Sequence, residues 1–159
     1  MLNSGYIERK LKETGIKIEE NAVSLIASKS EGHPYVLVSM CYAIIDSMAE
    51  NEKKITEETV KTALPKIYND LAKDFFAPMF HPLTPKAKEV LLTLARSISG
   101  KEFSFSEAVN RTNKEANYLS PYIKEMLRKG VLNKPERGRY AFFHILFVEY
   151  LRGRGEDII

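Results

Sequence analysis

The chain has 159 residues, of which 44% are hydrophobic and 28% are charged, and this length and composition indicate one globular domain or two small ones and exclude extensive disorder. Its net charge of +3 is unevenly distributed: residues 111–154 carry ten Lys or Arg and four Glu, a net +6, whereas residues 1–110 carry a net −1. The basic excess favours a nucleic-acid-binding face in the C-terminal half, and the alternative is an ordinary solvated surface.

Cellular setting can be predicted from what the sequence lacks. No apolar run approaches the length of a membrane span, and the first residues lack a signal-peptide core. The single cysteine, Cys41, excludes an internal disulfide. We therefore expect a cytoplasmic protein without a membrane partner.

The first 66 residues predict four helices joined by polar turns. The expected helices cover about residues 4–14, 19–29 and 34–50, and a fourth begins after residue 56. Pro34 suits the first position of its helix, and Thr56 suits a cap. Pro65 should kink or end the fourth helix. These residues form an expected helical lid-like subdomain, 1–66.

Residues 67–82 are expected to connect two domains. Their large apolar side chains are Leu71, Phe75, Phe76, Met79 and Phe80. These are too apolar for a free linker, so we expect them to pack one domain against the other. The second domain would then cover residues 83–159.

The second domain begins with further helix signals. Thr84-Pro85 is a cap followed by a first-turn proline, and Gly100 should end that helix. Ser104 or Ser106 would cap a short helix over 107–111. A third helix would begin either at Asn113, with a kink at Pro121, or at Ser120.

The third helix leads into a hairpin. Its apolar positions Leu119, Ile123, Met126 and Leu127 share one face, and Gly130 is a stop signal. Two strand-like runs, 131–132 and 140–143, flank a basic, turn-rich segment. Such a helix and hairpin resemble the recognition helix and wing of a winged-helix module. A last helix is expected over 146–152. The expected fold is therefore mainly α, a helical lid followed by a winged-helix domain.

A family resemblance spans nearly the whole chain. Glu-Gly-His-Pro-Tyr at 31–35, opening an apolar helix, resembles the Gly-x-Pro motif of STAND/AAA+-type P-loop ATPases, the archaeal members above all. The other similar stretches are Leu83-Thr84-Pro85-Lys86, the run 122–132, and Phe143-His144 followed by Glu149-Tyr150-Leu151-Arg152. In that family a helical lid precedes a winged helix. The resemblance implies that Gly32, His33 and Pro34 approach the adenine of a nucleotide bound by a P-loop domain.

The chain departs from this family in its catalytic motifs. It has no Gly-x-x-x-x-Gly-Lys-[Ser/Thr], no strand ending in Mg²⁺-binding acids, and no Arg between Lys10 and Arg96 to act as the lid sensor. We therefore expect no enzymatic activity from this chain alone. A P-loop domain, in cis upstream or in trans, would hold ATP and Mg²⁺. The chain would be the C-terminal part of a longer ATPase or a derivative that lost its motor.

DNA is the other expected partner. The candidate contacts are Asn113, Lys114, Asn117, Tyr118, Lys124, Arg128, Lys134, Arg137 and Arg139. The helix residues would enter the major groove, and those of the hairpin would touch phosphates. Two alternatives stay open. One is a stand-alone winged-helix transcriptional regulator. The other is a protein-binding winged helix, since Glu115, Glu125 and Glu136 interrupt the basic face.

Other kinds of site find little support. The three histidines, His33, His81 and His144, lack metal-ligand spacing, so we expect no metal site. Cys41 falls on an apolar stripe and is expected in the core. The aromatic residues of the C-terminal half could stack on bases, but core packing is the commoner role at this spacing.

Overall fold

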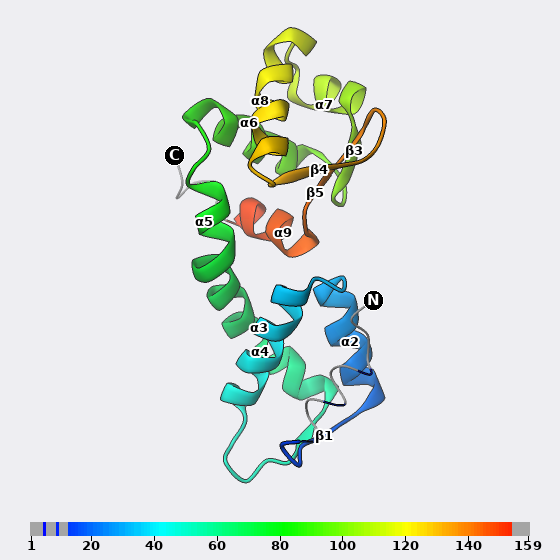
Figure 1. Cartoon of the computed structure of the whole chain (residues 1–159), viewed down its shortest axis with the longest axis vertical. Coiled ribbons are helices and arrows are strands. Elements are labelled where there is room, and N and C mark those ends of the chain that lie inside the picture. The colour runs from blue at the N-terminus through cyan, green and yellow to red at the C-terminus, as the bar shows by residue number, and fades with distance from the viewer. Residues whose placement is uncertain (1–4, 6–8, 10–12, 154–159) are drawn as a thin grey trace. The chain divides into compact units, whose positions relative to one another are not determined.

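The computed structural model describes Gly5, Arg9 and residues 13–153, which fall into two compact units, Met1–Ala72 and Lys73–Ile159 (Figure 1). Helices dominate both units, and a small antiparallel sheet belongs to the second. The expected mainly α fold is confirmed. The helix predicted over 4–14 lies largely outside the described residues.

Within residues 13–72, the first unit contains three helices: α2 (Glu20–Ser30), α3 (Pro34–Ser47) and α4 (Glu57–Leu71). All three pack on one another. Their buried side chains include Ala22, Val23, Ile26, Val36, Leu37, Met40, Ala43, Ile44, Val60, Ala63, Ile67 and Leu71. Cys41 is only half-buried, on the flank of α3.

Local signals set the helix starts of this unit. Pro34 occupies the first turn of α3, where no N–H is needed. The Thr56 hydroxyl accepts a hydrogen bond from the Thr59 backbone N–H at 3.1 Å. In turn, the Thr59 hydroxyl accepts one from the Thr56 backbone N–H, which completes a capping box. Helix α4 does not end at Pro65 but continues to Leu71. Both Pro65 and Lys61 are exposed, so water can satisfy the Lys61 carbonyl that the proline leaves without its helical donor.

Two short strands, β1 (Lys17–Ile18) and β2 (Lys54–Ile55), pair in parallel and were not predicted. Each has two residues, too few for a period of two to show in the sequence. Ile55, the second residue of β2, is buried. The pair thus joins the entrance of α2 to that of α4.

The second unit begins with helical residues that supply core aromatics. A π-helical segment (Ala72–Phe76) and α5 (Ala77–Phe80) follow α4 in the chain. The Phe76 ring lies 5.6 Å from Phe147 and 5.5 Å from Tyr150, both on α9 (Ile145–Gly153). Phe76 and Phe80 are fully buried. These aromatic side chains therefore belong to the core of the second unit.

The remaining elements make a winged helix. Helix α6 (Pro85–Ser97) is followed by β3 (Glu102–Ser104), α7 (Phe105–Thr112) and α8 (Ala116–Arg128), and then by the hairpin of β4 (Leu132–Glu136) and β5 (Arg139–Phe142). The sheet order is β3-β5-β4, antiparallel throughout. β3 was not predicted, because its three residues lie next to a helix cap. We refer to the β4–β5 hairpin as the wing.

Two helices of this unit have an end that differs from the prediction. Helix α6 ends at Ser97, three residues before Gly100, and Arg152 of α9 donates to the Ala95 and Ile98 carbonyls at 2.7 Å each. Helix α8 starts at Ala116, after Asn113 ends α7 with a φ of 53°. Neither Asn113 nor Ser120 begins it.

The buried face of α8 is narrower than predicted. Leu119, Ile123 and Met126 are at most 2% exposed, whereas Leu127 is half-buried. At about 100° per residue, Leu127 lies about 40° round the helix from Ile123, on the side away from Met126, and so falls at the edge of the buried face. The predicted core position of Leu127 is therefore wrong.

Candidate nucleic-acid interface

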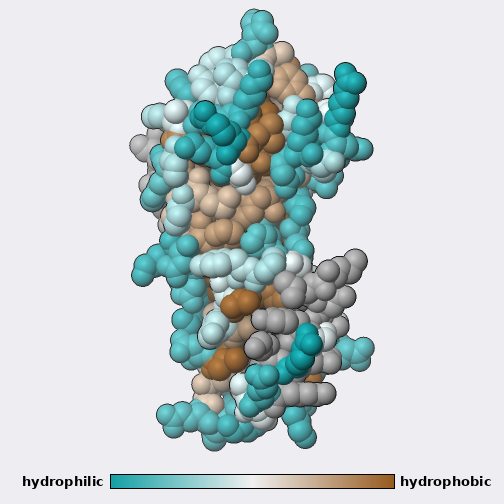
Figure 2. Space-filling view, viewed as in Figure 1, coloured by the Kyte–Doolittle hydropathy of each residue, from teal (hydrophilic) through white to brown (hydrophobic). Residues whose placement is uncertain are grey.

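The outward face of α8 carries Asn117, Pro121, Lys124 and Arg128, all exposed. Their spacing of four, three and four residues places them in one line, opposite the buried Leu119, Ile123 and Met126. The hydrophobic core thus orients this line toward solvent. Figure 2 shows hydrophilic side chains gathered over the part of the molecule that holds α7, α8 and the wing.

Glu125, the carboxylate nearest this line in sequence, is turned toward α6. The Thr84 N–H donates to Glu125 Oε1 and the Thr84 hydroxyl donates to Oε2, at 2.8 Å each. The Thr84 hydroxyl also accepts the Ala87 N–H, so it caps α6 as predicted. Because Glu125 is committed to this cap, it does not divide the basic line of α8 as the sequence suggested.

One flank of α8 joins aromatic and basic side chains. The Tyr118 and Tyr122 rings meet edge to face at 5.3 Å, and the Lys114 ammonium lies 5.4 Å from the Tyr118 ring centre. Lys86, in the first turn of α6, lies within electrostatic range of both tyrosines. The pKa of Lys86 is raised, first by its hydrogen bond to Glu89 and then by the charge of that carboxylate.

Sequence reasoning missed Lys86. Its separation from Tyr118 is large in sequence, and no local pattern connects a residue in the first turn of α6 with the flank of α8. Only the packing of α6 on α8 brings them together.

The wing presents three basic residues in different settings. Lys134 lies 5.7 Å from the ring centre of Tyr140, which stacks on Phe103. Arg139 Nη2 is 3.3 Å from a Glu102 oxygen, and its Nε is 3.7 Å from a Glu136 oxygen. Arg137 is exposed at the tip and makes no ion pair within the described part of the chain.

The nine candidate DNA contacts therefore divide by location. Asn117, Lys124 and Arg128 form the outward line of α8, whereas Lys114 and Tyr118 lie on its flank or just before it. The wing holds Lys134, Arg137 and Arg139. Asn113 is the exposed residue that ends α7. All nine belong to the second unit.

The candidate nucleotide-contacting turn lies in the first unit, between α2 and α3. Glu31 and Gly32 both have positive φ, 50° and 71°, and the His33 N–H donates to the Ser30 carbonyl at 2.8 Å. A side chain at position 32 would meet no atom within 4 Å, so the backbone is open to approach there. Burial lowers the pKa of His33, which favours the neutral imidazole.

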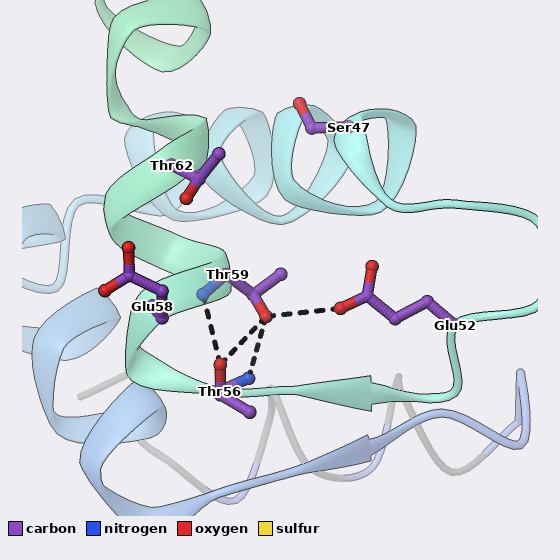
Figure 3. A pocket seen from close by; sticks show the side chains of 6 residues that line it. All are labelled: Ser47, Glu52, Thr56, Glu58, Thr59 and Thr62. Carbon is purple, nitrogen blue, oxygen red and sulfur yellow. Dashed lines mark hydrogen bonds between the residues drawn. The ribbon is translucent and has the colours of Figure 1, made fainter.

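A polar depression also opens between the end of α3 and the start of α4 (Figure 3). Six side chains line its volume of about 270 Å³: Ser47, Glu52, Thr56, Glu58, Thr59 and Thr62. The dashed lines in Figure 3 mark the Thr56–Thr59 capping bonds and a 3.5 Å contact from Thr59 to Glu52. The Thr56 and Thr59 hydroxyls in this depression are therefore engaged in capping α4.

Among the described residues, no three His, Cys, Asp or Glu side chains are grouped as metal ligands would be. None of the helices described has the length and apolar character needed to cross a bilayer.

Comparison with known proteins gives limited matches. Residues 73–151 match a family described as Domain of unknown function (DUF8462), and no curated protein matches the chain. The Thermotoga maritima RuvB Holliday junction branch migration motor is a similar solved structure, with 21% identity over 87% of this chain and 44% of that one and a TM-score of 0.42. A single-residue variant of that motor gives 20% identity at the same coverage and TM-score. The chain thus spans less than half the length of these solved structures.

Proposed function

We propose that this chain is the helical lid and winged-helix part of an AAA+-type ATPase, and that its winged helix binds double-stranded DNA through the outward face of α8. The observation that carries the DNA-binding proposal is the exposed line of Asn117, Lys124 and Arg128. The carboxylate of Glu125, which would oppose DNA there, is held by Thr84.

The geometry of α8 suits a major groove. Eleven residues separate Asn117 from Arg128, which corresponds to about 16 Å of helix at 1.5 Å per residue. Asn, Lys and Arg are side chains that can bond base edges in that groove, and a groove of about 12 Å admits a helix. The tip of the wing, with Arg137, would reach phosphates.

Duplex binding measured across a salt series tests this proposal. Replacing Lys124 and Arg128 together with alanine should weaken duplex binding, and it should lower the slope of log K against log salt by about one for each of the two cations that neutralises a phosphate. The matched control replaces Lys53 and Lys61, two exposed lysines of the first unit, and should leave the slope unchanged. A wild type that binds no duplex at low salt would exclude DNA binding and favour a protein partner.

The ATPase context rests on the motif at 31–35 and on the order of lid and winged helix. Gly32, His33 and Pro34 would face the adenine of ATP held with Mg²⁺ by a P-loop domain, which would supply the phosphate chemistry. The neutral imidazole favoured at His33 and the open backbone at Gly32 suit contact with an uncharged base. The finer assignment, to archaeal STAND-type ATPases, rests on the same residues.

The coding sequence upstream of the Met1 codon tests this context. A P-loop motif in the same reading frame, or in an adjacent gene whose product binds this chain, would support it. The chain alone should show no ATP turnover. ATP turnover that purified with the wild-type chain would contradict the proposal that a separate P-loop domain supplies the phosphate chemistry.

A further inference from the structure

The outward line of α8 has two halves of different chemistry. Its first two members, Asn117 and Pro121, are uncharged and exposed, and its last two, Lys124 and Arg128, are basic and exposed. Asn117 and Pro121 are four residues apart in the helix, so they are neighbours on the same face. The uncharged half therefore offers DNA something other than charge.

Pro121 is an unusual residue for its place in α8. It lies beyond the first turn, where a proline lacks the N–H that the helix needs and crowds the preceding turn. Its side chain is exposed, so burial offsets little of that cost. The carbonyl that loses its helical donor is that of Asn117, four residues earlier. This part of the face thus combines a side-chain amide, an additional backbone acceptor and an apolar ring.

The two halves of the line also differ in reach. Lys124 and Arg128 carry their charges at the ends of long, flexible side chains, which can extend to phosphates at the rim of a groove. The amide of Asn117 and the ring of Pro121 stay close to the helix backbone. In a major groove filled by α8, the atoms next to the helix are base edges. The uncharged half is therefore placed to read bases, and the basic half to bind the backbone.

We infer that Asn117 and Pro121 read an A·T-containing sequence, Asn117 through two hydrogen bonds to one adenine and Pro121 through contact with a thymine methyl. This inference rests on the proposed duplex binding. The acceptor and donor of an Asn amide match N6 and N7 of adenine, and apolar side chains contact the thymine methyl. The two residues are about 6 Å apart along the helix, and base pairs are about 3.4 Å apart, so the two bases belong to pairs one or two steps apart.

Selection from duplexes with a randomised central segment tests this readout on the full chain. The wild type should enrich adenine at one position and thymine one or two base pairs away. Asn117→Ala should lose the adenine preference and keep the wild-type salt dependence, because an amide neutralises no phosphate. The matched control, Asn69→Ala, removes an exposed asparagine of α4 and should enrich the same sequence as the wild type.

Base analogues in the enriched duplex test each contact from the DNA side. Replacing the adenine with 7-deazaadenine removes the N7 acceptor, which should weaken wild-type binding about fivefold and leave binding by Asn117→Ala unchanged. Replacing the thymine with deoxyuridine removes the methyl, which should weaken wild-type binding about threefold and leave binding by Pro121→Ser unchanged. Pro121→Ser restores the missing N–H, so α8 should remain folded in this variant.

The possible results distinguish this inference from the proposed function. A wild type that binds no duplex at low salt would overturn both. Salt-dependent binding without an enriched sequence would overturn the base readout alone, and so would an unchanged adenine preference in Asn117→Ala. Enrichment of another base at the position that depends on Asn117 would overturn its assignment to adenine. An equal response of the wild type and the matching variant to an analogue would overturn that contact.

Discussion

Helices α3 and α8 are close in length and bury similar faces, yet their outward faces differ completely. Helix α3 buries Leu37, Met40 and Ile44, and its exposed large side chains are uncharged: Tyr35, Val38, Tyr42 and Ile45. Helix α8 buries Leu119, Ile123 and Met126, and its outward line carries Lys124 and Arg128. The buried faces explain why both segments are helices. The exposed faces differ, with large uncharged side chains on α3 and basic side chains on α8.

The buried face of α8 provides the largest expected effect. Ile123→Ala should reduce the free energy of unfolding of the second unit by about 2–5 kcal/mol, because it leaves a cavity in the core. Leu127→Ala should lose less than about 2 kcal/mol, because part of its side chain is already in water. Amide hydrogen exchange would measure both changes in each unit separately.

Leu37→Ala on α3 is the control for this comparison. It should produce a loss of similar size, about 2–5 kcal/mol, but in the first unit. Equal effects of Ile123→Ala and Leu127→Ala would contradict the orientation of α8.

Much of this contrast could be predicted from the sequence, because periodicity and caps are local. Pro34, Thr56 and Thr84 mark helix starts where the structure has them. The buried faces follow from spacing of three and four residues. Spacing alone placed Leu127 with the core residues because it lies four positions after Ile123, but its side chain is only half-buried.

The candidate site was less accessible to sequence reasoning. Which charges oppose one another depends on contacts across the fold. Glu125 reaches Thr84 over 41 positions, and Arg139 reaches Glu102 over 37. A sequence pattern counts these carboxylates as part of the basic face, whereas packing removes Glu125 from it. The outward line of α8 thus carries Lys124 and Arg128 with no carboxylate among them.

The second prediction concerns the hydrogen bonds between Thr84 and Glu125. Glu125→Ala removes two hydrogen bonds from Thr84 and should destabilise the second unit by about 1 kcal/mol. Glu125→Gln should be milder, since an amide can still bond the Thr84 hydroxyl and N–H. Urea unfolding measures both. The control Glu115→Ala removes an exposed carboxylate without a capping bond and should stay within about 0.5 kcal/mol.

A third prediction compares the two arginines of the wing. If the wing contacts DNA, Arg137→Ala should lower the slope of log K against log salt by about one. Arg139→Ala should lower it by less, because Glu102 and Glu136 already neutralise that guanidinium. Both variants should remain folded, since exposed substitutions usually change stability by about 0.5 kcal/mol or less. Equal slopes for the wild type and Arg137→Ala would place the wing away from the DNA.

The smallest effect is expected at Cys41, on the flank of α3 between its buried face and its exposed large side chains. Burial raises the pKa of the Cys41 thiol to about 11, so the native thiol stays protonated while an unfolded one begins to ionise near pH 9. Because thiolate is the reactive form, alkylation by iodoacetamide at pH 8 should be on the order of a hundredfold slower in the native chain than in urea.

The free energy of unfolding should be unaffected by Cys41 well below pH 9 and should fall as the pH rises toward 11, since only the unfolded state gains from ionisation there. Cys41 is the chain's single cysteine, so mass spectrometry reports its modification directly. Equal rates in buffer and in urea would show that the flank of α3 is open to solvent and would extend the exposed surface of this helix beyond its exposed large side chains.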